Sequence, residues 1–176
     1  FIMQNHRTAT GPETLRLLKQ RPEDSSKGTF GCLCALCGSD RMTGAAVLSA
    51  LGALRSGVGL LRLASTPRAL ETLQRVLYEP VFLEPEEIAS APFDAFLCGC
   101  GIGRAYDGLL AELLPRLRAP MVLDADCINY LAAHIDVQEK LQAPYILTPH
   151  PGEMARLTRS TPEAVQRDRA GLAERY

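Results

Sequence analysis

The sequence predicts an α/β domain in which a mostly parallel central sheet is covered by helices on both faces. Short apolar runs alternate with segments whose apolar residues recur at helical spacing, and this alternation is typical of strand–helix–strand units. The runs are almost continuously apolar rather than apolar at every second position, as expected for strands buried on both faces. With 176 residues, 47% of them hydrophobic, the chain can bury the core of one domain.

The first predicted strand is the apolar run "CLCALCGS", which Gly-Ser ends. Residues 43–57 predict a helix from the spacing of Ala, Val and Leu, with Thr43 as N-cap and Gly57 as C-cap. "GLLRLAST" predicts the second strand. Residues 67–77 predict a helix that opens on a proline, whose fixed φ suits that position.

Four further strands are predicted in the second part of the chain, at "YEPVFLE", "FDAFLCGCG", "PMVLDAD" and "APYILTPH". Between them, "YDGLLAELLPRL" predicts a helix that ends near Pro115, and "CINYLAAH" predicts a short helix. Helices at residues 152–158 and 162–175 are expected to follow the last strand. These crossovers between parallel strands should be right-handed.

Residues 1–24 are polar and interrupted by proline and glycine, so they predict a leader or linker with one short helix near Glu13–Lys19. The domain is expected to occupy residues 25–176. The start lacks the charged segment and long apolar stretch of a secretory signal, and it has no initiator methionine. We therefore expect a piece of a longer chain.

Charge and composition exclude several functional classes. The formal net charge is -1, so there is no electrostatic footprint for nucleic acid or an anionic membrane surface. No apolar run reaches the roughly 20 residues that span a bilayer. The six cysteines match no zinc-site spacing, so we predict no metal site but reduced, mostly buried thiols in strands, which suit a cytoplasmic protein.

Four segments that directly follow predicted strands carry the candidate chemistry: "GSDRMTGAA", "GCGIGR", "DADCIN" and "TPHPGE". Ligands of open parallel sheets bind outside the carboxyl ends of the strands, so these segments are expected to converge on one rim. Ala45 and Ala46, at a helix start, either let an anion approach free N–H groups or pack against the sheet. Gly101 and Gly103 either bring backbone amides against a substrate or form a tight turn.

Charged and polar side chains stand at the same predicted rim. Asp124 ends an apolar strand and can hold Mg²⁺ through water or orient a hydroxyl, whereas Asp126 is expected to be a helix N-cap. His150 lies between two prolines that hold it on a stiff corner, which leaves open a structural hydrogen bond or a ligand contact. Glu153 either caps the next helix or binds a substrate hydroxyl.

Taken together, "KGTFG", "GSDRMTGAAVLSALGALRSGVGLL", "GCGIGR", "VLDADCIN" and "ILTPHPGEMARL" resemble, in this order, the ADP/ATP-dependent NAD(P)H-hydrate dehydratases. The resemblance covers most of residues 25–170 and implies a ribokinase-like three-layer sandwich. It implies repair of the S epimer of hydrated NADH or NADPH (NADHX, NADPHX). ADP, or ATP, would phosphorylate the hydroxyl, phosphate would then be eliminated, and Mg²⁺ would neutralise the nucleotide phosphates.

The resemblance also implies roles for individual residues. The substrate-binding residues would be Ala45, Ala46, Gly101, Gly103, Asp124, Asn129, His150 and Glu153. Lys27 would lie near the nucleotide phosphates, and we expect it to converge with Asp124 and His150 on one rim. His150 would orient the substrate rather than act as the catalytic base.

The sequence departs from the family pattern at Ser26, where the family has histidine, and at Cys100, where it has proline. Beyond the position of Tyr176 the family continues with nucleotide contacts and the catalytic base. We therefore expect the N-terminal two-thirds of the domain, inactive by itself. A small-molecule kinase of the same fold and an inactive nucleotide-binding fragment are the alternatives. We expect a homo-oligomer, such as a tetramer, and leave open an epimerase domain in the parent chain.

Overall fold

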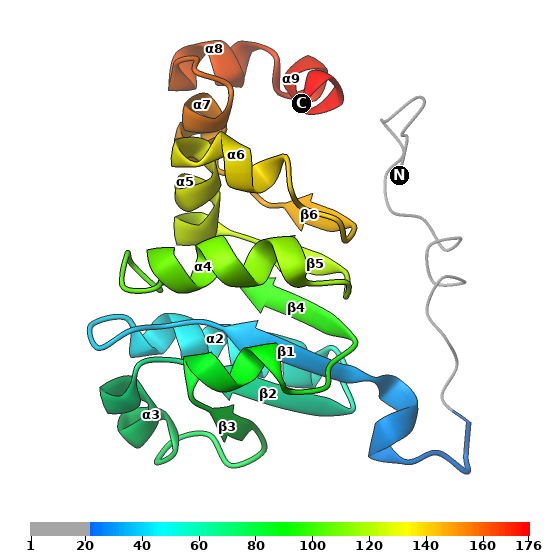
Figure 1. The fold of residues 1–176 in the computed structure, drawn as a ribbon. Coiled ribbons are helices and arrows are strands. Elements are labelled where there is room, and N and C mark those ends of the chain that lie inside the picture. Colours follow the sequence, from blue (N-terminus) through cyan, green and yellow to red (C-terminus); the bar gives the residue numbers. More distant parts are fainter. Residues whose placement is uncertain (1–21) are drawn as a thin grey trace.

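Six parallel strands form one sheet in the order β3-β2-β1-β4-β5-β6 (Figure 1). This computed structural model describes residues 22–176. The strands are β1 (Cys32–Leu36), β2 (Leu60–Ala64), β3 (Val81–Leu83), β4 (Ala95–Cys98), β5 (Met121–Leu123) and β6 (Tyr145–Leu147). All six predicted strands are confirmed, each shorter than its apolar run because the flanking residues turn into the loops.

Helices connect the strands. They are η1 (Lys27–Phe30), α2 (Thr43–Arg55), α3 (Pro67–Leu73), η2 (Pro85–Ala89), α4 (Asp107–Leu113), η3 (Leu114–Arg116), α5 (Ala125–Ala133), α6 (Ile135–Gln138), α7 (Pro151–Leu157), α8 (Pro162–Arg167) and α9 (Arg169–Arg175). The short elements η1, η2 and α6 were not predicted. The helix expected near Glu13–Lys19 lies outside the described residues.

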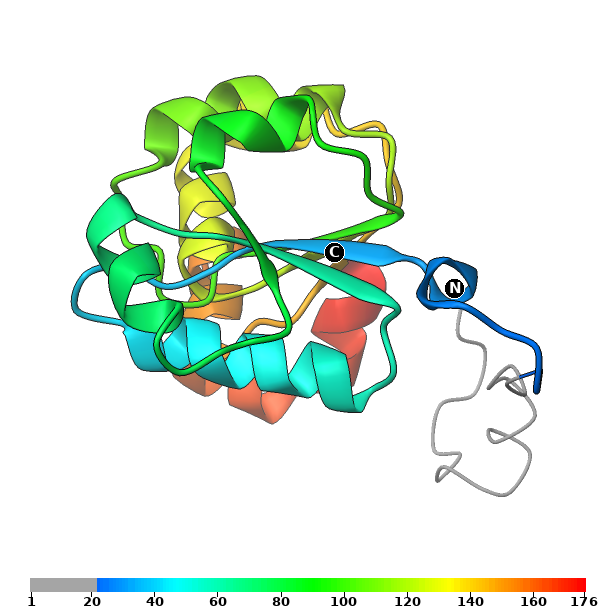
Figure 2. The same cartoon turned by 90° about the horizontal axis from the view of Figure 1, so that it is seen from below.

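The sheet separates two hydrophobic cores, because successive residues of a strand point to opposite faces. Cys34 and Leu36 of β1 are buried in the core on the α4 side, whereas Ala35 and the following Cys37 are buried on the α2 side. Figure 2 shows α2 (cyan) and α4 (green) on opposite sides of the sheet. The prediction that helices cover both faces of a parallel sheet is therefore confirmed.

Two helix ends differ from the prediction. Met42, not Thr43, is the N-cap of α2, and it makes no side-chain capping bond. Ser56 is the C-cap, and Gly57 follows it with a φ of 94°, which suits glycine. The single helix expected over residues 162–175 is two, because the backbone leaves the helical region at Asp168, whose carboxylate accepts a hydrogen bond from the Gly171 N–H and so caps α9.

Most of the cysteines are buried, as small apolar residues are. All six are free; four are buried and two, Cys32 and Cys100, are half-buried. In the part of the chain that the structure describes, no three His, Cys, Asp or Glu side chains could hold a metal ion together. Nor does any helix of residues 22–176 have the length and apolar character to cross a membrane.

Candidate functional site

The glycine loop after β4 lies between α2 and α5. Gly99 and Gly101 have φ values of 122° and 70°, in the region that only glycine adopts without strain. A Cβ on Gly101 would lie 2.9 Å from the Cβ atoms of both Ala45 and Met42. The loop and the start of α2 are therefore in close contact, and the predicted convergence of Ala45 with Gly101 is confirmed.

The two alanines at the start of α2 differ in their surroundings. Ala46 is fully buried, and a Cβ on Gly38 would lie only 2.7 Å from its Cβ, so its side chain packs against the loop that follows β1. Ala45 is half-buried on the rim, and a Cβ on Gly44 would meet nothing within 4 Å. The first turn of α2, which has no side-chain cap, is thus accessible at Gly44 and Ala45.

Asp124 directly follows β5, and its carboxylate contacts two neighbouring segments. Its Oδ1 accepts a hydrogen bond of 2.7 Å from the Thr148 hydroxyl, and its Oδ2 lies 3.5 Å from the Cys100 sulfur. Asp124 also occupies the N-cap position of α5, without a side-chain capping bond. The carboxylate therefore links the glycine loop to the segment after β6, at the predicted rim.

Asp126 is not the N-cap that the sequence predicted. It lies inside the first turn of α5, and its Oδ2 accepts a hydrogen bond of 2.8 Å from the Gly103 N–H. Between the two aspartates, Ala125 has a φ of 46°, a strained value for alanine. This turn directs the two carboxylates to different partners, and Asp126 fixes the end of the glycine loop.

His150 is the N-cap of α7. Its Nδ1 accepts a hydrogen bond from the Gly152 N–H at 3.0 Å, which corresponds to the neutral tautomer with a proton on Nε2. Nε2 lies 3.2 Å from Glu153 Oε1, while Glu153 Oε2 accepts from the His150 N–H at 2.9 Å. The capping role proposed for Glu153 is confirmed, and Glu153 is buried. The His150 side chain is still 62% exposed, so a ligand can reach it.

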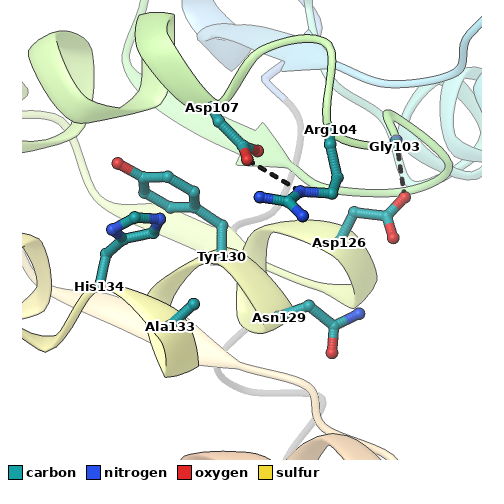
Figure 3. A pocket seen from close by; sticks show the side chains of 8 residues that line it. All are labelled: Gly103, Arg104, Asp107, Asp126, Asn129, Tyr130, Ala133 and His134. Atoms are coloured by element: carbon teal, nitrogen blue, oxygen red, sulfur yellow. Dashed lines mark hydrogen bonds and ion pairs between the residues drawn. The ribbon is translucent and has the colours of Figure 1, made fainter.

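Asn129 lies farther along α5, where its Oδ1 accepts a hydrogen bond of 2.7 Å from Arg156. It borders a pocket of about 310 Å³ between α4 and α5 (Figure 3). The pocket is lined by Gly103, Arg104, Asp107, Asp126, Asn129, Tyr130, Ala133 and His134. Of the predicted substrate-binding residues, only Gly103 and Asn129 line it, so the other predicted residues lie outside this pocket.

Lys27 lies at the opposite end of the sheet from the rim. It begins η1, which precedes β1, and a Cβ on Gly59, just before β2, would lie 1.8 Å from the Lys27 carbonyl oxygen. In a parallel sheet, residues that precede strands gather at the amino edge (Figure 1). The expectation that Lys27 shares a rim with Asp124 and His150 is therefore wrong, while its contact with nucleotide phosphates stays a prediction.

Several residues of the rim were not predicted from the sequence. Thr148 directly follows β6, the same signal that identified Asp124 after β5. Ser65, directly after β2, and Tyr106 have buried hydroxyls without a hydrogen-bond partner among the described residues. Burial, together with the nearby carboxylates of Glu86, Asp40 and Glu84, raises the pKa of Tyr106 to about 12. Tyr106 is therefore a hydrogen-bond donor at neutral pH rather than a base.

Comparison with known proteins agrees with this geometry. A model of the NAD(P)H-hydrate dehydratase family matches residues 33–176. The chain is 36% identical to the ADP-dependent (S)-NAD(P)H-hydrate dehydratase of Neisseria meningitidis, over 90% of this chain and 56% of that protein. It is 34% identical to the bifunctional NAD(P)H-hydrate repair enzyme Nnr of Moorella thermoacetica, over 98% of this chain and 36% of that protein.

Solved structures agree as well. The ADP/ATP-dependent NAD(P)H-hydrate dehydratase of Bacillus subtilis, co-crystallised with ATP/Mg²⁺, superposes with a TM-score of 0.76 at 31% identity, over 92% of this chain and 59% of that chain. A ribokinase-like superfamily protein of Enterococcus faecalis, 24% identical over 87% of this chain and 58% of that chain, has a TM-score of 0.71, which confirms the ribokinase-like fold. This chain spans less than two-thirds of each protein compared. It belongs to the NAD(P)H-hydrate dehydratase family.

Proposed function

We propose that the protein is a carbon–oxygen lyase that dehydrates the S epimer of hydrated NADH or NADPH with ADP or ATP as co-substrate. The observation that supports this most is the convergence of the α2 start, the glycine loop and the Asp124–Thr148 pair at the carboxyl edge of the sheet. That edge is where open parallel sheets bind ligands. The reaction would return the reduced nicotinamide cofactor.

The chemistry needs a better leaving group than hydroxide. Transfer of the terminal phosphoryl group of ADP to the ring hydroxyl gives AMP and a phosphate ester. The ring nitrogen then donates its electron pair as the carbon–oxygen bond breaks, phosphate leaves, and a proton is lost from the neighbouring carbon. The products balance as NADPH or NADH, phosphate and AMP, or ADP when ATP is used.

The rim residues supply orientation for this reaction. Asp124, held by Thr148, accepts a hydrogen bond from the ring hydroxyl and so sets its direction. The small residues Ala45 and Gly101 let the ring approach the backbone, and the accessible first turn of α2 suits an anionic group of the substrate. The exposed imidazole of His150 is held on a fixed turn, where it contacts and orients the nicotinamide part of the substrate.

Among the described residues, we expect Mg²⁺ to bind through the phosphates of the nucleotide rather than through a set of protein ligands. Residues 22–176 contain no cluster of three side chains that could hold a metal, and Mg²⁺ in nucleotide sites commonly takes most of its ligands from phosphates and water. Its place is therefore assigned to the nucleotide phosphates and not to a protein cage. A homo-oligomer, and an epimerase domain in the same protein, stay predictions.

The function is tested by incubating the full protein with S-epimer NADPH hydrate, Mg²⁺ and either ADP or ATP. We expect NADPH absorbance to return, with one AMP formed per NADPH when ADP is used. A small-molecule kinase would instead consume ATP and leave a stable phosphate ester. Ester accumulation without NADPH recovery would contradict the dehydratase assignment, and comparison of the two nucleotides decides which is preferred.

His150→Asn separates the two roles of the histidine. Asparagine is among the best N-cap residues, so the free energy of unfolding should stay close to wild type, whereas His150→Ala should lose about 1 kcal/mol. Both variants lose the imidazole, and we expect the KM for the hydrate to rise by about tenfold, roughly one hydrogen bond. An unchanged KM in His150→Asn would show that the residue only caps α7.

A further inference from the structure

Cys37 and Cys100 are brought together on one side of the sheet. Leu36 and Cys98 are register partners of β1 and β4, and just beyond them the Gly38 N–H donates to the Cys100 carbonyl at 2.7 Å. The positive φ at Gly99 turns the chain so that Cys100 packs into the core on the α2 side, the core that contains Cys37. Their backbones are thus neighbours, and their side chains share one face.

The two thiols lie in the same core. Cys37 is fully buried there and Cys100 packs against the same cluster, so each thiol is the main influence on the pKa of the other. Cys37 and then Ser49 lower the pKa of Cys100, although burial and Asp124 oppose this. The neighbouring Cys100 and complete burial raise the pKa of Cys37. Cys100 is therefore the more readily ionised thiol of the two.

Access distinguishes this pair from the other thiols near the rim. Cys100 is half-buried, whereas Cys98 and Cys127 are both buried, and burial is the main cause that raises the pKa of Cys98. Cys32 is half-buried too, but it begins β1 at the amino edge of the sheet. Of the six cysteines, only Cys100 is partly exposed, lies at the candidate site and has a second thiol beside it.

We propose that Cys100 is an oxidation site, at which a hydroperoxide forms a sulfenic acid that Cys37 converts into a Cys37–Cys100 disulfide. In the first step the Cys100 thiolate attacks the peroxide, the oxygen–oxygen bond breaks, and hydroxide leaves. In the second, the Cys37 sulfur displaces the sulfenic oxygen, which leaves as water. Overall, two thiols and H₂O₂ give one disulfide and two waters.

The disulfide would close the candidate site. Cys100 stands between Gly99 and Gly101 and contacts Asp124 at 3.5 Å, so drawing its sulfur into a bond with Cys37 removes that contact and shifts the glycine loop. Disulfide geometry is narrow, so the loop must adjust. This loss of activity rests on the proposed function, whereas formation of the disulfide does not.

The experiment treats the full protein with hydrogen peroxide, blocks free thiols with N-ethylmaleimide under denaturing conditions, and maps the peptides by mass spectrometry. We expect a cross-linked peptide pair containing Cys37 and Cys100, lighter by two hydrogens and absent after dithiothreitol. Activity lost on oxidation should return with dithiothreitol. The control variant Cys32→Ser should keep the cross-link and its reversibility.

Cys37→Ala should form no cross-link, and a growing share of Cys100 should be oxidised to sulfinic acid that dithiothreitol does not reduce. Complete N-ethylmaleimide labelling of Cys37 and Cys100 after peroxide, or a cross-link that joins Cys98 to Cys127 instead, would overturn the proposal. Because mass mapping needs no turnover, a wrong assignment of the reaction would leave this result unaffected.

Discussion

Replacement of Gly99 by alanine is expected to disrupt the carboxyl edge of the sheet and abolish activity. A Cβ at this position would lie 1.8 Å from the Asp124 carbonyl oxygen and 2.8 Å from the Cys127 Cβ, so the backbone of β4 or α5 must move. The φ of 122° adds about 1–3 kcal/mol for any side chain. The steric clash and the backbone strain together cost a large part of the roughly 5–15 kcal/mol free energy of unfolding of a domain.

Urea-induced unfolding measures the effect, with two other glycines as controls. Gly103 also has a positive φ, 63°, but a Cβ there would meet nothing within 4 Å, so Gly103→Ala should cost only about 1–2 kcal/mol. Gly108 lies within α4 with equal space, and Gly108→Ala should stabilise by about 0.5–1 kcal/mol. Equal stability of the Gly99 and Gly103 variants would show that the close approach to Asp124 is not real.

The sheet could be predicted from the sequence because burial on both faces leaves a direct pattern. Parallel strands covered on both faces are almost continuously apolar, and the runs around Leu36, Leu63 and Leu123 show this, with Arg62 as the one charged residue. The convergence of Ala45 with Gly101 followed from topology, since the segments that carry them follow β1 and β4. Such predictions succeed where backbone topology fixes the position of a residue.

The wrong predictions, for Lys27 and Asp126, were based on a family resemblance and on residue preference rather than on the order of strands and loops. Lys27 precedes a strand, which places it at the amino edge whatever it binds, yet the resemblance placed it beside Asp124. Asp126 is a good N-cap residue, but the helix begins two residues earlier through the unusual φ of Ala125. No pattern of residue types predicts an alanine with left-handed backbone geometry. The N-cap of α5 and the different hydrogen-bond partners of Asp124 and Asp126 could therefore not be predicted from the sequence.

The turn at His150 is compatible with both roles considered from the sequence, a structural hydrogen bond and a ligand contact. Pro149 and Pro151 restrict the backbone, and the imidazole completes the start of α7 with the buried Glu153. The structural hydrogen bond left open by the sequence is therefore present. The same bonds fix the ring while leaving most of it exposed, and a fixed ring loses little entropy when a ligand binds.

Asp124→Asn is expected to lower kcat/KM for the hydrate by about 10–100-fold, the usual loss for a hydrogen bond to a charged group, while leaving the fold intact. Asparagine has the same shape and can still accept the Thr148 hydrogen bond through its amide oxygen. The negative charge that orients the substrate hydroxyl is lost. Steady-state kinetics of NADPH recovery and urea-induced unfolding of the same preparations separate the two effects.

Asp94→Asn is the matched control, because Asp94 is also a carboxylate fixed by a hydrogen bond, with its Oδ2 accepting from the Cys32 N–H at 2.7 Å. It lies just before β4, at the amino edge of the sheet, so the same change of charge should leave kcat/KM near wild type. Equal losses in both variants would attribute the effect to charge or stability in general. If Asp124→Asn has wild-type kinetics, Asp124 does not orient the substrate. Its role would then be structural, as the residue that links the glycine loop to Thr148.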